Sequence, residues 1–72
     1  MPTPPVGKNM EACRRDLGIT AAALAREIGV QPITFYRWRE GTVTPKWENV
    51  VAASEVFHKT PDWFYGEHDD DV

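Results

Sequence analysis

The stretch 21–40 reads AAALAREIGVQPITFYRWRE and contains the features that decide the fold of this chain. A small residue, Ala25, stands at its fifth position, where two helices that cross steeply leave no room for a larger side chain. A glycine, Gly29, stands at its ninth position, where the turn between the helices requires a positive φ that glycine adopts without steric cost. Apolar residues fill the positions that would be buried between two such helices: Leu24, Ile28, Val30, Phe35 and Trp38.

This combination predicts a helix-turn-helix, two short helices packed at a steep angle. An amphipathic segment of unrelated structure matches the apolar positions easily, but it rarely also matches the small residue and the glycine. The alternative is a helical hairpin that has no role in DNA binding.

The 72 residues are enough for one small domain, and 42% of them are hydrophobic, which permits a packed core. Cys13 is the single cysteine, so no intrachain disulfide forms, as is typical of proteins in a reducing cytoplasm. No apolar run approaches the roughly 20 residues that span a bilayer, and the first residues, MPTPPVGKN, do not resemble a signal peptide. We therefore expect a cytoplasmic protein with no membrane partner.

The net charge of −3 is unusual for a protein that binds DNA, but its distribution is uneven. Four of the eleven acidic residues lie in the last six positions, EHDDDV, and without them residues 1–66 carry a charge of +1. We expect residues 1–6 to form a flexible arm, residues 7–66 the domain, and residues 67–72 an acidic tail. The tail is expected either to compete with DNA electrostatically or to serve solubility alone.

We predict an all-α fold of five helices, over residues 7–17, 21–28, 32–40, 45–57 and 61–65. Three of these begin with a proline at the first helical position, where its missing N–H costs nothing: Pro32, Pro45 and Pro61. Thr20, Thr44 and Thr60 precede helices as N-caps. In the first helix, Met10, Cys13 or Arg14, and Leu17 are spaced to share one face.

From about Met10 to Glu67 the chain resembles the Cro/repressor (Xre-like) family of phage and bacterial regulators. Three segments carry the resemblance: Gly18-Ile19-Thr20 with Arg14 four residues before it, the run from Trp38 to Pro45 (WREGTVTP), and the run from Asp62 to Glu67 (DWFYGE). The resemblance implies a compact, five-helix, lambda-repressor-like DNA-binding domain. It also implies a transcriptional regulator that binds a pseudo-palindromic operator as a homodimer, without a cofactor, in the bacterial cytoplasm or nucleoid.

In such a domain the helix over residues 32–40 lies in the major groove, with its N-terminal residues on the base edges. Arg37 is suited to bond guanine O6 and N7 together, and Ile33 is suited to pack on a thymine methyl group. Tyr36 is expected to contact a base edge, a phosphate or a protein partner. The expected base contacts are Gln31, Pro32, Ile33, Tyr36 and Arg37.

Phosphate contacts are expected at the N-terminus of the second helix, where backbone N–H groups lack intrahelical acceptors, and in the segments around the third helix. The expected residues are Thr20, Ala21, Arg14, Arg39, Thr42, Thr44 and Lys46. The resemblance also places a dimer interface near the end of the fourth helix and the fifth helix, with Phe57, His58, Pro61, Trp63 and Tyr65 as its residues.

The chain departs from the family pattern at three places. Ala21 stands where the family often has a glutamine, and the loop Thr42-Val43-Thr44 lacks the usual lysines. Arg39 replaces the glutamate that pairs with the arginine of the first helix, so Arg14 needs another acid, either Glu11 or Glu40. These departures favour a second hypothesis, a protein-interaction module on the same fold, such as an antirepressor or an antitoxin.

The sequence contains no recognisable arrangement of catalytic residues or of metal ligands. Cys13 is expected to be a half-buried core residue, and His58 and His68 have no partner at ligand spacing. The aspartates of the tail form no defined cage for a cation. We therefore expect no enzymatic activity, no cofactor, no metal and no small-molecule ligand.

Overall fold

The computed structural model describes residues 5–68 as four α-helices and one 3₁₀ helix, without a strand in that range. The elements are α1 (Val6–Leu17), α2 (Ala21–Ile28), α3 (Pro32–Glu40), α4 (Trp47–Phe57) and the 3₁₀ helix η1 (Pro61–Tyr65). The predicted all-α class and the order of five helical segments are confirmed. The acidic residues 69–71 and the first four residues of the predicted arm lie outside the described range.

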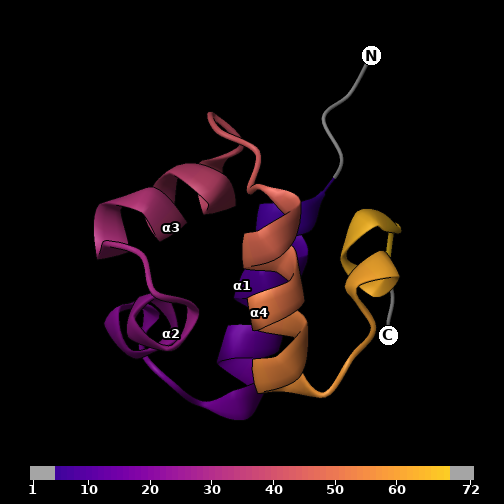
Figure 1. Ribbon diagram of the computed structural model, residues 1–72, viewed down its shortest axis with the longest axis horizontal. Coiled ribbons are helices and arrows are strands. Elements are labelled where there is room, and N and C mark those ends of the chain that lie inside the picture. The colour runs from indigo at the N-terminus through magenta and orange to yellow at the C-terminus, as the bar shows by residue number, and fades with distance from the viewer. Residues whose placement is uncertain (1–4, 69–72) are drawn as a thin grey trace.

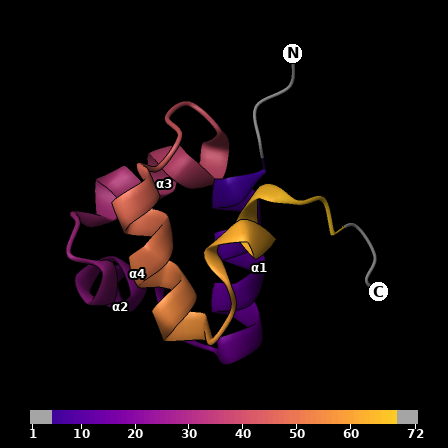
Figure 2. The same ribbon diagram turned by 45° about the vertical axis from the view of Figure 1, so that its right-hand side comes forward.

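Helices α1 and α4 lie at the centre of the molecule (Figure 1). Helices α2 and α3 lie together on one side of this pair in both views, and η1 lies on the other side in Figure 1 and in front of α1 in Figure 2. The helix-turn-helix and the predicted dimer segment η1 therefore occupy different sides of the domain.

The ends of α2 and α3 follow the local chemistry of the sequence. The Thr20 hydroxyl accepts a hydrogen bond from the Ala23 N–H at 3.0 Å, which caps the start of α2. Gly29 ends α2 with a φ of +95°, and its N–H donates to the Ala25 carbonyl at 2.8 Å. Gly41 ends α3 with a φ of +84°. The turn predicted at Gly29 is confirmed.

Four details of the predicted helices are wrong. Helix α4 begins at Trp47 rather than Pro45, because Lys46 keeps an extended backbone and its carbonyl accepts the first helical bonds, while Pro45 is buried ahead of the helix. Helix α1 begins one residue early, at the fully buried Val6. Leu17, which the spacing places on one face with Met10 and Cys13, is 55% exposed, whereas those two residues are buried. The fifth helix is of the 3₁₀ type, and Thr60 makes no side-chain cap bond to it.

The core gathers one or more residues from every helix. Its ten buried hydrophobic residues are Val6, Met10, Cys13, Leu24, Ala25, Phe35, Trp38, Val50, Ala53 and Phe64. Ile28 and Val30, predicted to be buried, are partly buried and pack against this cluster. The buried Asn9 side chain donates hydrogen bonds to the main-chain carbonyls of Phe64 (2.9 Å) and Gly66 (2.8 Å) and thereby fixes η1 on α1.

Within residues 5–68, no helix is both long enough and apolar enough to cross a bilayer.

Candidate nucleic-acid interface

Helix α3 divides its side chains between the core and the outer surface. Phe35 is fully buried and Trp38 is 3% exposed, and their rings meet edge to face with centroids 6.4 Å apart. The opposite face presents Ile33, which is 53% exposed, and the exposed Arg37. An exposed isoleucine beside an exposed arginine is a surface suited to base edges, because apolar groups fit thymine methyls and guanidinium groups fit guanine.

Three other predicted base-contact residues lie beside this strip. Gln31 is exposed at the start of α3, and its side chain makes no cap bond. Pro32 is half-buried, as is Tyr36, which packs against the core. The Arg39 guanidinium lies 4.8 Å from the centre of the Tyr36 ring, so a cation–π contact holds Arg39 against the helix surface.

The predicted phosphate contacts around the helix-turn-helix occupy two segments. At the start of α2, Thr20 is exposed and Ala21 is half-buried, and helix geometry leaves the first N–H groups without intrahelical acceptors. After α3, Thr42, Thr44 and Lys46 are all exposed. The Thr42 hydroxyl donates to the Arg37 carbonyl at 3.1 Å, so it helps to close the end of α3.

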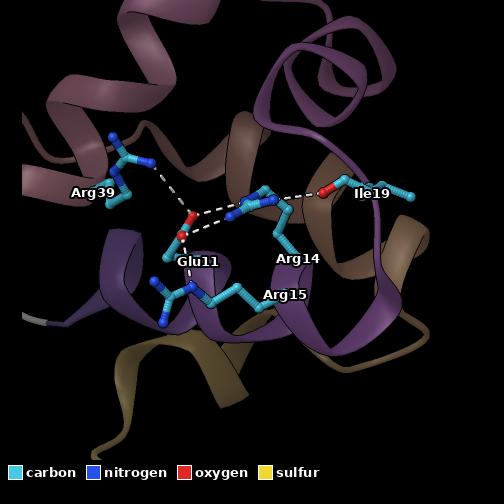
Figure 3. A network of polar contacts seen from close by, with 5 residues as sticks. All are labelled: Glu11, Arg14, Arg15, Ile19 and Arg39. Atoms are coloured by element: carbon cyan, nitrogen blue, oxygen red, sulfur yellow. Dashed lines mark hydrogen bonds and ion pairs between the residues drawn. The ribbon is translucent and has the colours of Figure 1, made fainter.

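The carboxylate of Glu11 joins α1 to α3, the helix that carries this surface. Glu11 of α1 receives two hydrogen bonds from Arg14, from Nε to Oε1 at 2.8 Å and from Nη2 to Oε2 at 2.7 Å (Figure 3). Arg15 Nε lies 3.2 Å from Oε2, and Arg39 Nη1 of α3 lies 3.8 Å from Oε1. Arg14 Nη1 also donates to the main-chain carbonyl of Ile19. Glu11 is therefore the acid that takes the place of the family glutamate.

Glu40, the other acid considered for this role, is exposed and forms no ion pair within residues 5–68. The Glu11 side chain is only 14% exposed. Its hydrogen bonds with Arg14, and then the positive charges around it, hold the Glu11 pKa below its ordinary value despite partial burial. The same pairing raises the pKa of Arg14. Both groups are charged at neutral pH.

The residues predicted for a dimer interface lie around η1 and the end of α4. Phe57 packs against Phe64 with ring centroids 6.3 Å apart, and Tyr65 stacks on Trp47 at 6.0 Å. His58 is exposed and ends α4 in a left-handed conformation, with a φ of +57°. Pro61 and Trp63 are half-buried.

Trp63 has polar groups near its ring that the sequence did not indicate. The His68 ring stacks on it with centroids 4.0 Å apart, and Lys59 Nζ lies 4.4 Å from the ring centre. His68 Nε2 is also 2.7 Å from the Trp63 carbonyl. Lys59 precedes η1 and His68 follows it, so no single helical pattern links them to Trp63. The buried Asn9, in contrast, was detectable because it shares a helix face with Val6 and Met10.

Cys13 belongs to the core, as predicted, but it is buried rather than half-buried, and burial raises the pKa of its thiol. No group of three or more histidine, cysteine or acidic side chains within residues 5–68 is arranged to hold a metal ion.

Comparison with known proteins defines the class to which this fold and surface belong. The model of a helix-turn-helix family matches residues 10–64, which is most of the chain. The chain therefore belongs to the Xre-like helix-turn-helix family, as the resemblance predicted.

One particular repressor is similar to this chain in both sequence and structure. The C2 repressor of Salmonella phage P22 is 32% identical over 63 residues, which cover 88% of this chain and 29% of the repressor. A crystal structure of the P22 c2 repressor with a synthetic operator superposes with a TM-score of 0.77 at 31% identity, covering 86% of this chain and 94% of that one. The solution structure of the DNA-binding domain of the same repressor gives a TM-score of 0.83 at 28% identity, covering 100% and 95%. The chain thus spans under a third of the length of the curated repressor it matches.

Proposed function

We propose that this protein is a phage-repressor-like transcriptional regulator that binds operator DNA through α3. The observation that carries the proposal is the exposed strip of Ile33 and Arg37 on the second helix of a helix-turn-helix. The likeness to a repressor solved with its operator supports the same role for this surface.

In the proposed complex, Arg37 bonds a guanine edge and Ile33 packs on a thymine methyl group. Gln31 and Pro32 border the same bases, and Tyr36 completes this side of α3. Phosphates are held by the start of α2 at Thr20 and Ala21, and by Arg39, Thr42, Thr44 and Lys46. Arg14 is the exception, because Glu11 and the Ile19 carbonyl already occupy its guanidinium.

We further propose that the protein acts as a homodimer on a pseudo-palindromic site. Two recognition helices then lie about one helical turn, roughly 34 Å, apart. The proposed interface comprises Phe57, His58, Pro61, Trp63 and Tyr65, which surround η1 on the side of the domain away from α2 and α3 (Figure 1). An interface on that side leaves both recognition helices free to face DNA.

A second candidate function is a protein-interaction module on the same fold. The low positive charge of residues 1–66 and the lysine-free loop 42–44 favour it, because both weaken attraction to phosphates. In that case the exposed Ile33 and the neighbouring Tyr36 would contact a protein instead of DNA.

Selection of bound sequences from a randomised duplex pool, at about 0.1 M salt, tests the two candidates. Operator binding predicts an enriched inverted repeat whose half-site spacing gives the dimer geometry. The absence of enrichment by protein that circular dichroism proves to be folded would reject operator binding and favour the interaction module.

A further inference from the structure

The Glu11 carboxylate is fully used as a hydrogen-bond and ion-pair acceptor. Two oxygens provide about four acceptor positions, and four nitrogen atoms lie near them: two from Arg14, one from Arg15 and one from Arg39. Arg15 is 76% exposed, so its share of the pairing contributes little to stability. Arg14, which is 18% exposed and makes two hydrogen bonds, is the main partner. Arg39, which is 36% exposed and lies 3.8 Å away, makes a weaker ion pair, but it is the partner that links Glu11 to α3.

These two partners extend from Glu11 in different directions (Figure 3). Arg39 lies in the last turn of α3 and reaches the carboxylate from the recognition helix. Arg14 continues the connection to the Ile19 carbonyl, which immediately precedes the Thr20 cap of α2. A chain of polar contacts thus runs from the end of α3, through α1, to the start of α2.

We propose that Glu11 is a positioning residue for DNA binding, which holds the phosphate-facing start of α2 and the cationic end of α3 in one fixed arrangement. This inference rests on the proposed function, because it names the residue that sets the geometry of the proposed interface. Glu11 itself contacts no DNA in this proposal.

The sign of a charge effect separates positioning from simple electrostatics. A carboxylate near a DNA-facing surface repels phosphates, so its neutralisation alone strengthens binding to any duplex. If Glu11 positions Arg39 and α2, its neutralisation instead weakens binding to the selected duplex, although the protein becomes more positive.

The experiment compares Glu11→Gln with Glu55→Gln in the full chain. Glu55 lies exposed on α4 and forms no ion pair within residues 5–68, so its variant makes the same change in net charge at a site without the network. Affinity is measured for the duplex enriched by the wild-type protein and for a random duplex. Hydrogen exchange is followed at the amides of Ala23 and Leu24, both of which bond to Thr20.

We expect Glu11→Gln to lose at least about fivefold in affinity for the selected duplex and to exchange the two amides about fivefold faster, as disruption of a coupled network would. Glu55→Gln should keep or slightly raise both affinities and leave the exchange unchanged. If Glu11→Gln binds the selected duplex as tightly as Glu55→Gln does, with unchanged exchange, the positioning role is rejected.

Three further variants, Arg39→Gln, Arg37→Gln and Glu11→Asp, keep the test decisive if Glu11→Gln is too unstable to use. Arg39→Gln removes the ion pair with Glu11 together with the cation–π contact to Tyr36 and leaves the Arg14 pair intact. Arg37→Gln makes the same chemical change on α3 outside the network. Combined with Glu11→Asp in a double-mutant cycle of unfolding free energies, Arg39→Gln should show coupling and Arg37→Gln none. If the wild-type protein enriches no sequence, the proposed function fails, whereas amide exchange and the cycle still decide whether Glu11 fixes α2 and α3.

Discussion

Gly7 in the first turn of α1 lies directly against the main-chain carbonyl of Trp38 in α3, with no space between them for a Cβ atom. This contact brings α3 into close contact with α1. It explains why a residue with poor helix propensity stands inside α1.

Substitution Gly7→Ala should destabilise the domain by about 2 kcal/mol, because overlap with the Trp38 backbone outweighs the roughly 1 kcal/mol that alanine adds in a helix. Urea unfolding followed by far-ultraviolet circular dichroism measures the change. Lys8→Ala, an exposed neighbour on the same helix, is the control and should change stability little. A Gly7→Ala variant more stable than wild type would contradict the close packing.

The Glu11 network should make stability depend on acid pH. The folded-state pKa of Glu11 lies below its ordinary value of about 4.3, so its stabilisation is complete above that pH and is lost as the pH falls through the folded-state value. The difference in unfolding free energy between wild type and Glu11→Gln should therefore shrink as the pH is lowered from 6 towards 3. A difference that stays constant over this range would show that the pairing contributes nothing.

Arg37→Ala should weaken binding to the selected duplex by about 1–3 kcal/mol and relax the preference at one guanine. Fluorescence anisotropy with the selected duplex and its single-base variants measures both effects. Arg26→Ala removes an exposed arginine from α2 and should reduce affinity without changing the base preference. An unaltered preference in Arg37→Ala would remove Arg37 from the base contacts.

Trp63→Ala should loosen the proposed dimer and thereby weaken operator binding, since Trp63 presents the largest ring among the proposed interface residues. Sedimentation velocity over a range of protein concentrations measures the association. Leu17→Ala, which truncates an exposed hydrophobic residue outside the proposed interface, is the control. A folded Trp63→Ala variant with wild-type sedimentation would place the interface elsewhere.

Cys13 should react slowly with thiol reagents in the folded protein, because it is buried and its pKa is raised. At pH 8 we expect alkylation roughly tenfold or more slower than in the urea-unfolded chain, limited by opening of the core. Mass spectrometry over time measures the rate. Equal rates in the two states would contradict burial of the thiol.

The helix-turn-helix was predictable because local chemistry determines both of its helices. Thr20 caps α2, Gly29 forms the turn and Gly41 ends α3, and each acts through its own backbone conformation or a bond to a near neighbour. The start of α4 was not predictable in this way. Thr44 and Pro45 form a good local start signal, but the predicted cap at Thr44 is wrong: Lys46 is the N-cap, the helix starts at Trp47, and Pro45 is buried ahead of it.

In the candidate site, too, contacts between near neighbours were predictable from the sequence, and contacts that depend on packing were not. The spacing of Glu11 and Arg14 on one helix identified a possible pair, yet the choice of Glu11 over Glu40 depends on how α3 packs on α1. The positions of Lys59 and His68 around Trp63 depend entirely on the path of the chain beyond α4. For Leu17 the helical spacing predicted a shared face with Met10 and Cys13, and nothing in the structure explains its exposure.

The Glu11 network also separates two tasks between two helices. Because α1 supplies the acid that neutralises Arg14, position 39 of α3 does not have to be acidic and carries a positive charge at the end of that helix. The charges at positions 11 and 39 are therefore interdependent: the side chain at position 11 decides which charge the end of α3 accommodates.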